Sequence, residues 1–470
     1  MPSAIAAVVF AVAIVGLFVL DRDRNLRTSK ALWIPVVWVS LAASRPISYW
    51  LGFGSRIEVV DQALEGSPLD RNILFALMAA GAIVLLRRGQ EVRTLLRANG
   101  PILAFFSYCA VSTVWSDYPL VAFKRWTKDL GDLMMVLIVL TERDRLAAVR
   151  QLLVRFGFVL VPVSVLLIKY YPALGVTYSR GGDVVRYSGV AVDKNFLGVI
   201  CLITGLGCVW RLVEAFRGHK GLRKARPLIA QVVVLGMALW LFGRADSMTA
   251  FAGFALASCV MVAMSLPVPS RNRAFVHFVV VPVLFLAFAI LFLDLGGAEL
   301  KGELGRDATL TERTVLWENL LGMNQHPLLG TGFESFWLGG RLERLWELHW
   351  WRPNEAHNGY LEVFLNLGWV GIGLLVLLIS TGYRNVVGAL RRDPNLGRLR
   401  VALFVATVVY GFTEAAFRVL NPMWMVFLLA TIAVPKSVPV PDAVAARSAT
   451  PSRFRRASWT APSVHSGVST

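Results

Sequence analysis

Charged side chains are scarce in this chain: Asp, Glu, Lys and Arg make up 17% of its 470 residues, whereas 56% are hydrophobic. That balance excludes an ordinary soluble protein. The sequence also lacks the HExxH zinc motif, the Walker phosphate loop, a Gly-rich nucleotide fingerprint and a DxD-like acidic pair in a suitable loop. Metal-dependent, nucleotide-dependent and ATP-driven activities are therefore unsupported, and we expect neither a metal nor another cofactor.

Cysteine is also rare. The four cysteines each lie inside an apolar run, and their spacing fits no metal site: Cys109, Cys201, Cys208 and Cys259. We interpret them as small core residues and not as a redox or disulfide device.

Long apolar runs recur through the chain. A helix that spans a bilayer needs about 20 mostly apolar residues, and helices satisfy their own backbone hydrogen bonds in lipid. The sequence therefore predicts an all-α polytopic membrane protein with about 12–13 transmembrane helices. The candidate spans are 3–20, 31–50, 72–86, 101–115, 129–141, 156–171, 196–213, 228–243, 248–266, 274–295, 361–380, 399–417 and 423–434.

The net charge of +18 is unevenly distributed along the chain. The positive-inside rule makes the segments rich in Lys and Arg cytoplasmic and places the intervening segments on the other side of the membrane. This alternation argues against nucleic acid as the partner of the positive charge. The basic segments are Arg22–Lys30, Arg87–Arg97, Arg143–Arg155, Arg211–Arg226, Arg271–Arg273, Arg384–Arg400 and the C-terminal tail.

We divide the chain into a single polytopic membrane domain, 1–434, and a tail, 435–470, whose Pro, Ser, Ala and Arg content predicts a disordered cytoplasmic segment. Within the membrane domain, we expect segment 296–360 to be a long loop between the tenth and eleventh candidate spans, on the side opposite the basic segments. Its tryptophans predict a folded cap with short helices, and their rings would lie at the membrane interface or stack on sugars. They are Trp317, Trp337, Trp346, Trp350 and Trp351.

The long loop ends at a polar pair, His357-Asn358, just before an apolar helix. Asn358 would cap that helix. The pair can instead form a reactive site, because the pKa of histidine lies near neutrality and a neutral imidazole at His357 would orient or deprotonate an attacking hydroxyl. The local pattern leaves both interpretations open.

Arg313 lies earlier in the same loop, in a segment that reads as a helix beginning near Thr311. A planar guanidinium near the membrane surface is suited to clamp a phosphate or pyrophosphate, although an isolated arginine is commonly just a surface residue. The helix leads to His326–Phe333, where a Gly-x-Gly predicts a turn. We interpret His326, which precedes a proline, as part of that turn.

Three further cations lie outside the basic segments. Arg186 and Lys194 precede the seventh candidate span, and Arg244 lies between the eighth and the ninth. Charges this close to lipid are costly and are usually paired or functional. We treat all three as candidate substrate-binding residues. The alternative is local ion pairing of Lys194 with Asp193 and of Arg244 with Asp246.

These motifs together resemble the O-antigen ligase and Wzy-type polysaccharide polymerase superfamily. The ligase signature of His, then Asn, Ser or Gln, nine residues, Gly, two residues, and Gly, Thr or Tyr is matched by His357, Asn358, Gly368 and Gly371. The resemblance covers residues 30–434, with its specific motifs mainly in 186–371. Supporting similarities, especially to the exopolysaccharide-polymerase branch, are Arg45-Pro46, Trp115-Ser116, Arg186 with Lys194–Gly198, Arg313–Trp317 and His326–Phe333.

The resemblance implies a GT-C-type glycosyltransferase, multi-pass in the bacterial inner membrane, with its active site facing the periplasm. Such an enzyme transfers glycan from undecaprenyl pyrophosphate to an acceptor hydroxyl without metal or nucleotide. Arg313 would then bind the pyrophosphate, His357 would orient or activate the acceptor, and Asn358 would contact substrate. The implied partners are the lipid-linked glycan, membrane lipid, and a chain-length regulator or other polysaccharide-assembly proteins.

The chain departs from the family pattern at two positions. Family ligases carry a Ser-Arg-Gly/Thr-Ala-like motif, whereas here Met248 stands at the basic position and Arg244, nearly one turn earlier, is the candidate substitute. Asp193 stands where many relatives have His. These changes favour polymerisation of repeats, in exopolysaccharide or O-antigen biosynthesis, over ligation to lipid A core, which remains the second reading.

A transporter of lipid-linked oligosaccharides is the alternative from another functional class. It predicts ionisable residues within the spans and internal repeat symmetry. The candidate spans are almost free of charge and no convincing repeat is evident, so we favour the enzyme.

Overall fold

The computed structural model describes residues 1–23, 28–53, 67–178, 185–217, 225–266, 273–292 and 307–435. Within Met1–Val434, which forms one compact unit, the described strands are β1 (Val176–Tyr178) and β2 (Val185–Tyr187), paired antiparallel with Thr177 opposite Arg186. All other regular elements described there are helices, which confirms the predicted all-α fold. The predicted disordered tail lies outside the described residues, apart from Pro435.

Helices occupy every candidate span. Those long and apolar enough to cross a membrane, among the described residues, are α1 (Ser3–Leu20), α5 (Pro68–Arg87), α9 (Arg145–Tyr170), α11 (Lys194–Arg217), α12 (Ala225–Ala245) and α18 (Gly359–Arg392). Shorter apolar helices follow the other spans: α2 (Trp33–Ala43) after η1 (Lys30–Leu32), α7 (Gly100–Ser112) before η2 (Thr113–Trp115), α13 (Met248–Ala263), α14 (Arg273–Phe292) and α20 (Pro422–Thr431). The remaining two spans hold α8 (Pro119–Leu140) and α19 (Pro394–Tyr410). The short α3 (Ile47–Trp50) forms the end of candidate span 31–50, and α10 (Pro172–Gly175) follows span 156–171.

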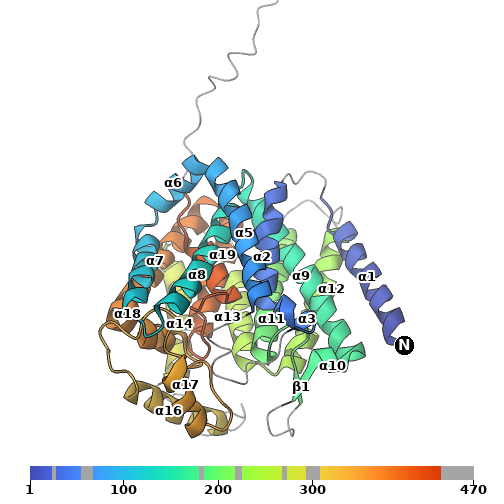
Figure 1. Cartoon of the computed structure of the whole chain (residues 1–470). Helices are drawn as coiled ribbons and strands as arrows, with labels where there is room; N and C mark the ends of the chain where they lie inside the picture. The colour runs from blue at the N-terminus through green and yellow to red at the C-terminus, as the bar shows by residue number, and fades with distance from the viewer. Residues whose placement is uncertain are drawn as a thin grey trace, which may run out of the picture. The chain divides into compact units, whose positions relative to one another are not determined.

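Within the described residues of Met1–Val434, the basic segments beside α5, α8, α9, α11 and α19 gather at one end of the helical bundle. Arg88 bonds to Glu142 at 2.6 Å, which joins the segment after α5 to the segment after α8. Arg150 and Asn395 both bond to Glu214, so the starts of α9 and α19 meet the end of α11. The short helix α6 (Gly89–Arg97) lies at this end, whereas α10, β1, α16 (Asp307–Gly322) and α17 (Gly339–Leu348) lie at the opposite end (Figure 1). A chain that crosses a membrane repeatedly under the positive-inside rule has this separation.

The expectation of spans nearly free of charge is wrong for α8. This helix begins at Pro119, ten residues before candidate span 129–141. The candidate span started late because charged residues interrupt the first half of the helix. Asp129 and Asp132 are both buried in the bundle. The indole N–H of Trp424 donates to Asp129 at 2.8 Å, and that of Trp38 donates to Asp132 at 2.6 Å. Buried carboxyl groups in a membrane helix are tolerated when they have such partners.

The described part of the long loop forms a helical cap with its own apolar core. In this cap α16 begins at Asp307, four residues before the expected start at Thr311. The helices α16 and α17 pack around a cluster separate from the main core, formed by Leu316, Leu320, Phe336, Trp337, Leu342, Leu345, Ala356 and Leu365. Because Leu365 belongs to α18, the cap is anchored on the first turns of that helix.

A kink in α18 explains the glycine of the histidine motif. Gly368 has φ 64° and ψ −162°, so α18 consists of two helical parts joined there. The turn after His326 lies against the kink, with backbone bonds from Thr331 N to Leu365 O at 3.1 Å and from Trp369 N to Pro327 O at 2.9 Å. A Cβ at Gly368 would come within 2.3 Å of the Leu328 carbonyl oxygen.

We therefore expect Gly368→Ala to lower the free energy of unfolding by about 1–3 kcal/mol, because it adds a side chain at positive φ against fixed backbone. Gly373→Ala is the matched control, since a Cβ there meets nothing within 4 Å and lies in regular helix. It should leave stability unchanged or raise it slightly. Thermal unfolding of the two purified variants tests this, and equal melting temperatures would contradict it.

Candidate active site

The two residues of the polar pair at the start of α18, His357 and Asn358, have different roles. The side-chain oxygen of Asn358 accepts hydrogen bonds from the backbone N–H groups of Tyr360 and Leu361 at 3.0 and 3.1 Å. Asn358 is therefore the N-cap of α18 and is itself buried, which is the structural alternative raised by the sequence. Its predicted contact with substrate remains a prediction. His357 precedes the cap in a left-handed conformation, φ 49°, that is unusual for a residue with a side chain.

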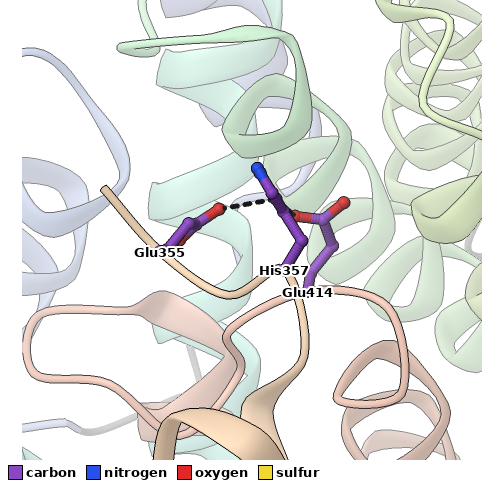
Figure 2. A group of neighbouring side chains, drawn as sticks. All are labelled: Glu355, His357 and Glu414. Carbon is purple, nitrogen blue, oxygen red and sulfur yellow. Dashed lines mark hydrogen bonds and ion pairs between the residues drawn. The ribbon is translucent and has the colours of Figure 1, made fainter. Parts of the chain in front are cut away.

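The imidazole of His357 lies between two carboxylates, as Figure 2 shows. Its Nδ1 is 3.0 Å from Glu355 Oε1 and 3.1 Å from Glu414 Oε2. The His357 side chain is 21% exposed, whereas that of Glu414 is only 5% exposed. Both carboxylates use Nδ1, and among the described residues no side chain or backbone group is bonded to Nε2. This second nitrogen is the one available to a substrate.

These contacts determine the protonation of His357. Burial alone would lower the pKa of the imidazole, but the negative charges of Glu355 and Glu414 outweigh burial and raise the pKa to about 10. Likewise, burial would raise the pKa of Glu355, but His357 and then Arg418 lower it to about 2. The charges around His357 therefore favour a protonated imidazole in the free protein over the neutral imidazole expected from the sequence. At neutral pH His357 is an imidazolium that donates hydrogen bonds.

Arg313 belongs to the same network. Its guanidinium donates to the Thr413 carbonyl at 2.9 Å and to Glu414 Oε1 at 3.1 Å. Arg313 and His357, which are 44 positions apart in the sequence, thus share one carboxylate. On the other side of His357, Arg418 contacts Glu355 and the buried Glu334, each at 3.4 Å.

The sequence interpretation missed Glu355, Glu414 and Arg418. Candidate span 399–417 placed Glu414 inside a transmembrane helix, but α19 ends at Tyr410 and an irregular segment continues to α20. Gly411 and the polar residues Thr413 and Glu414, which interrupt the apolar run, are the signal for this break in the sequence. Glu355 lies only two residues before His357, so its spacing was also visible in the sequence.

Glu355, His357 and Glu414 also have the composition of a metal site, since one ligand atom from each lies within 4.8 Å of the others. Their charges are already matched by protein groups, because Arg313 pairs with Glu414 and Arg418 with Glu355. A divalent cation would need to displace the shared proton from His357 and sit beside two guanidinium groups. These residues therefore fit a metal poorly.

Two of the other predicted cations, Lys194 and Arg244, lie at the start of α11 and at the end of α12. Lys194 bonds to Asp246 at 3.3 Å, so its partner is not the Asp193 expected from the sequence. Arg244 likewise does not pair with Asp246 in the structure; its guanidinium lies over the rings of Tyr187 and Trp240, 5.5 and 5.3 Å from their centroids.

Arg186, next to Tyr187 on β2, is exposed, and its contact with substrate remains a prediction.

Asp193 directly precedes Lys194 of this cation group, and it is near enough to Glu355 and Glu414 for their charges to act on it. Its Oδ1 accepts a bond from Phe196 N at 2.9 Å, and its side chain keeps contact with solvent. The protein packed around Asp193, and then the negative charges of Glu355 and Glu414, raise the pKa of this carboxyl above its usual value. No ion pair of Asp193 occurs among the described residues.

A second connection runs through the motif that lacks the family arginine. Thr413, whose carbonyl oxygen binds Arg313, donates its hydroxyl to Thr249 at 2.9 Å. Met248, at the position of that arginine, is 40% exposed beside this contact. The start of α13 therefore lies next to the Arg313–Glu414 pair, but Met248 contributes no positive charge there.

Most tryptophans of the cap have structural roles. The indole N–H groups of Trp317, Trp337 and Trp346 donate to Ala356 O, Glu362 Oε2 and Pro353 O at 2.8–2.9 Å. Trp351 lies against the ring of His357, with centroids 5.9 Å apart. Trp350 is 66% exposed, so it is the tryptophan best placed to stack on a sugar.

The fold and the site together define a multi-pass membrane protein with a charged site between the helical bundle and a cap, at the end opposite the basic segments. Residues 227–376 match the family model described as O-antigen ligase. The chain is 25% identical over 305 residues to the exopolysaccharide production protein ExoQ of Rhizobium meliloti (strain 1021), a match that covers 63% of this chain and 67% of that protein.

These matches confirm the resemblance to the O-antigen ligase and Wzy-type polysaccharide polymerase superfamily. They support a ligase- or polymerase-type function in polysaccharide synthesis, and with it a glycosyl-transferring enzyme. The region matched by the family model includes Arg244, Arg313 and His357, but it ends before Glu414 and Arg418.

Proposed function

We propose that this protein polymerises glycan repeats carried on undecaprenyl pyrophosphate, at the periplasmic face of the bacterial inner membrane. The observation that carries this proposal is the shared bonding of Arg313 and His357 to Glu414, at the end of the bundle opposite the basic segments. The positive-inside rule assigns that end to the periplasm. The name of the ExoQ relative and the absence of the family arginine at Met248 favour exopolysaccharide polymerisation. Ligation to lipid A core is the second candidate.

In the proposed reaction an acceptor hydroxyl attacks the anomeric carbon of the donor glycan. The bond from that carbon to the pyrophosphate oxygen breaks, and polyprenyl pyrophosphate leaves with the electron pair. Fixed cations in a site of low dielectric stabilise the departing charge. Arg313 and the His357 imidazolium stand on one side of the site, with Lys194 and Arg244 at the adjoining ends of α11 and α12.

The hydroxyl proton also needs an acceptor, and a protonated His357 cannot take it. Glu355 and Glu414 are each held by a guanidinium and by the imidazolium. Asp193 has no such ion pair among the described residues and keeps contact with solvent. We therefore assign the proton to Asp193, and we give His357 the role of holding the acceptor or the leaving group through Nε2.

This assignment predicts a pH profile with two limbs. Asp193 must be ionised, so kcat/KM should fall as pH decreases below about 6; His357 must be protonated, so kcat/KM should fall as pH increases through about 10. Asp193→Asn should lose most activity together with the acidic limb, whereas Asp117→Asn, which removes an exposed carboxylate paired with Arg341, should keep both limbs. Activity that climbs towards pH 10 would instead identify His357 as a neutral base.

We also propose that transfer requires no metal, because the carboxylates near His357 are already paired with protein cations. Full-length protein dialysed against EDTA should transfer glycan at the rate of untreated protein. A loss of activity that added Mg²⁺ or Mn²⁺ restores would overturn this.

Deletion of the gene followed by complementation tests the function as a whole. If the protein is a polymerase, the deletion strain should accumulate single lipid-linked repeats, and the wild-type gene should restore polymer. Polymer retained on the lipid carrier would indicate a ligase instead. Unchanged lipid-linked glycans and surface polysaccharide in the deletion strain would contradict both and favour a different role, such as transport of another lipid-linked oligosaccharide.

A further inference from the structure

A cavity of about 470 Å³ lies far from His357, between the start of α7 and the second half of α18. His277 of α14 and Thr431 of α20 complete its walls. Its polar lining includes Asn99, His277, Thr381, Tyr383, Arg384 and Asn385. Volumes of this size are typical of sites for small molecules or headgroups.

The length of α18 places this cavity at the opposite membrane surface from His357. Gly359 and Tyr383 are separated by 24 helical positions, or about 36 Å at 1.5 Å per residue, before the kink at Gly368 is allowed for. The hydrocarbon core of a bilayer is about 30 Å thick. The cavity therefore lies at the boundary between lipid tails and headgroups, on the side of the basic segments.

The lining includes one cation, Arg384, and no acidic residue. Arg384 is exposed at its edge, and His277 Nδ1 lies 2.7 Å from the Tyr383 hydroxyl. Arg97, the last residue of α6, directly precedes the first lining residue, Ala98, and adds a further cation nearby. A cavity of this composition selects an anion.

The surface next to the cavity is apolar and exposed. On α14, Phe278, Val281 and Phe285 are 76%, 52% and 61% exposed, and they form one face of the helix, adjacent to the side on which His277 lies. On α18, Leu377 is 44% exposed and precedes Thr381 by one turn. In a protein that spans a membrane, such a surface contacts lipid tails.

We propose that this cavity binds the headgroup phosphate of an anionic phospholipid, whose acyl chains lie along the exposed apolar face of α14 and the neighbouring part of α18. The phosphate would bond to Arg384, with the remaining side-chain N–H of Asn385 beside it, because the Thr381 hydroxyl already donates to the Leu377 carbonyl. Basic recesses between helices at the cytoplasmic surface suit such lipids. This site does not depend on the glycan chemistry at His357.

Native mass spectrometry of the full-length protein, released from detergent with added phosphatidylglycerol or phosphatidylcholine, tests the proposal. Wild-type protein should retain phosphatidylglycerol preferentially, and Arg384→Ala should weaken that retention about fivefold, the loss expected for one basic residue near a membrane surface. Arg384→Lys should recover part of it. Arg391→Ala, an exposed arginine on α18 that does not line the cavity, is the matched control and should bind as wild type does.

Three results would overturn the proposal: unchanged retention by Arg384→Ala, equal retention of phosphatidylcholine, or complete displacement of the lipid by inorganic phosphate at a matching concentration. The last result would identify a site for a free anion. Because Arg384 is exposed, the variant should unfold at the wild-type temperature, and that measurement separates loss of binding from loss of fold.

Discussion

Replacing His357 by alanine is expected to slow glycan transfer by the full-length protein by about 10²–10³-fold, the effect of removing one fixed donor from a site where charge develops. Two changes contribute. The variant loses the Nε2 donor, and it leaves Glu355 and Glu414 without the proton-bearing group that lies between them, so that their like charges repel. The rate of polymer formation from a purified lipid-linked repeat measures the loss.

His326→Ala is the matched control for this variant. His326 is an exposed histidine of the same cap, and its backbone carbonyl forms the turn bond to Gly330 N that alanine preserves. We expect wild-type turnover from it. A His357→Ala protein that has an unchanged melting temperature and full turnover would remove His357 from the reaction.

Arg313→Ala is expected to have a loss of similar size, about 10²–10³-fold in kcat/KM. Arg313 contributes positive charge to the site and also holds Glu414, which in turn bonds to His357. Lysine keeps the charge but cannot form two parallel bonds, to Thr413 O and Glu414, so Arg313→Lys should recover only part of the activity. A pH profile separates the two roles: if Arg313 acts by holding Glu414, the alkaline limb assigned to His357 should also shift in Arg313→Ala.

Arg344→Ala controls for a general loss of positive charge from the cap. Arg344 is exposed on α17, and no described contact joins it to the His357 network. Transfer at the wild-type rate is expected. If Arg344→Ala and Arg313→Ala slow transfer equally, the cap acts through its overall charge and the specific contacts of Arg313 carry no special weight.

The helices were predictable because apolar runs of bilayer length leave few alternatives for the backbone. The predictions failed where tertiary contacts override hydropathy. Candidate span 129–141 was expected to be nearly free of charge, but it contains Asp129 and Asp132, which two tryptophans distant in sequence satisfy. Candidate span 399–417 appeared continuous, although its helix ends at Tyr410 and releases Glu414 into the site.

The candidate site was predictable only in part for a similar reason. A motif identifies His357 and Arg313 as separate positions, but a sequence does not state which carboxylates surround an imidazole. The pKa of His357 depends in part on Glu414, which lies 57 residues later in the sequence. The same carboxylate links His357 to Arg313. The role of Asn358 as a helix cap was available from local chemistry alone, because capping involves only neighbouring backbone N–H groups.

The buried carboxylates of α8 also constrain how the chain enters the membrane. The partner of Asp129 is Trp424, which lies 295 positions later and is synthesised long after α8 has left the ribosome. Until then Asp129 has no indole to bond with, and an aspartate at the centre of a membrane helix costs about 2.5–3.5 kcal/mol during insertion. We therefore expect α8 to be stably inserted only after α20 has been synthesised and its Trp424 can bond to Asp129. A nascent chain that ends before Trp424 should leave α8 loosely held, so the last helix of the bundle completes the insertion of one of the earlier ones.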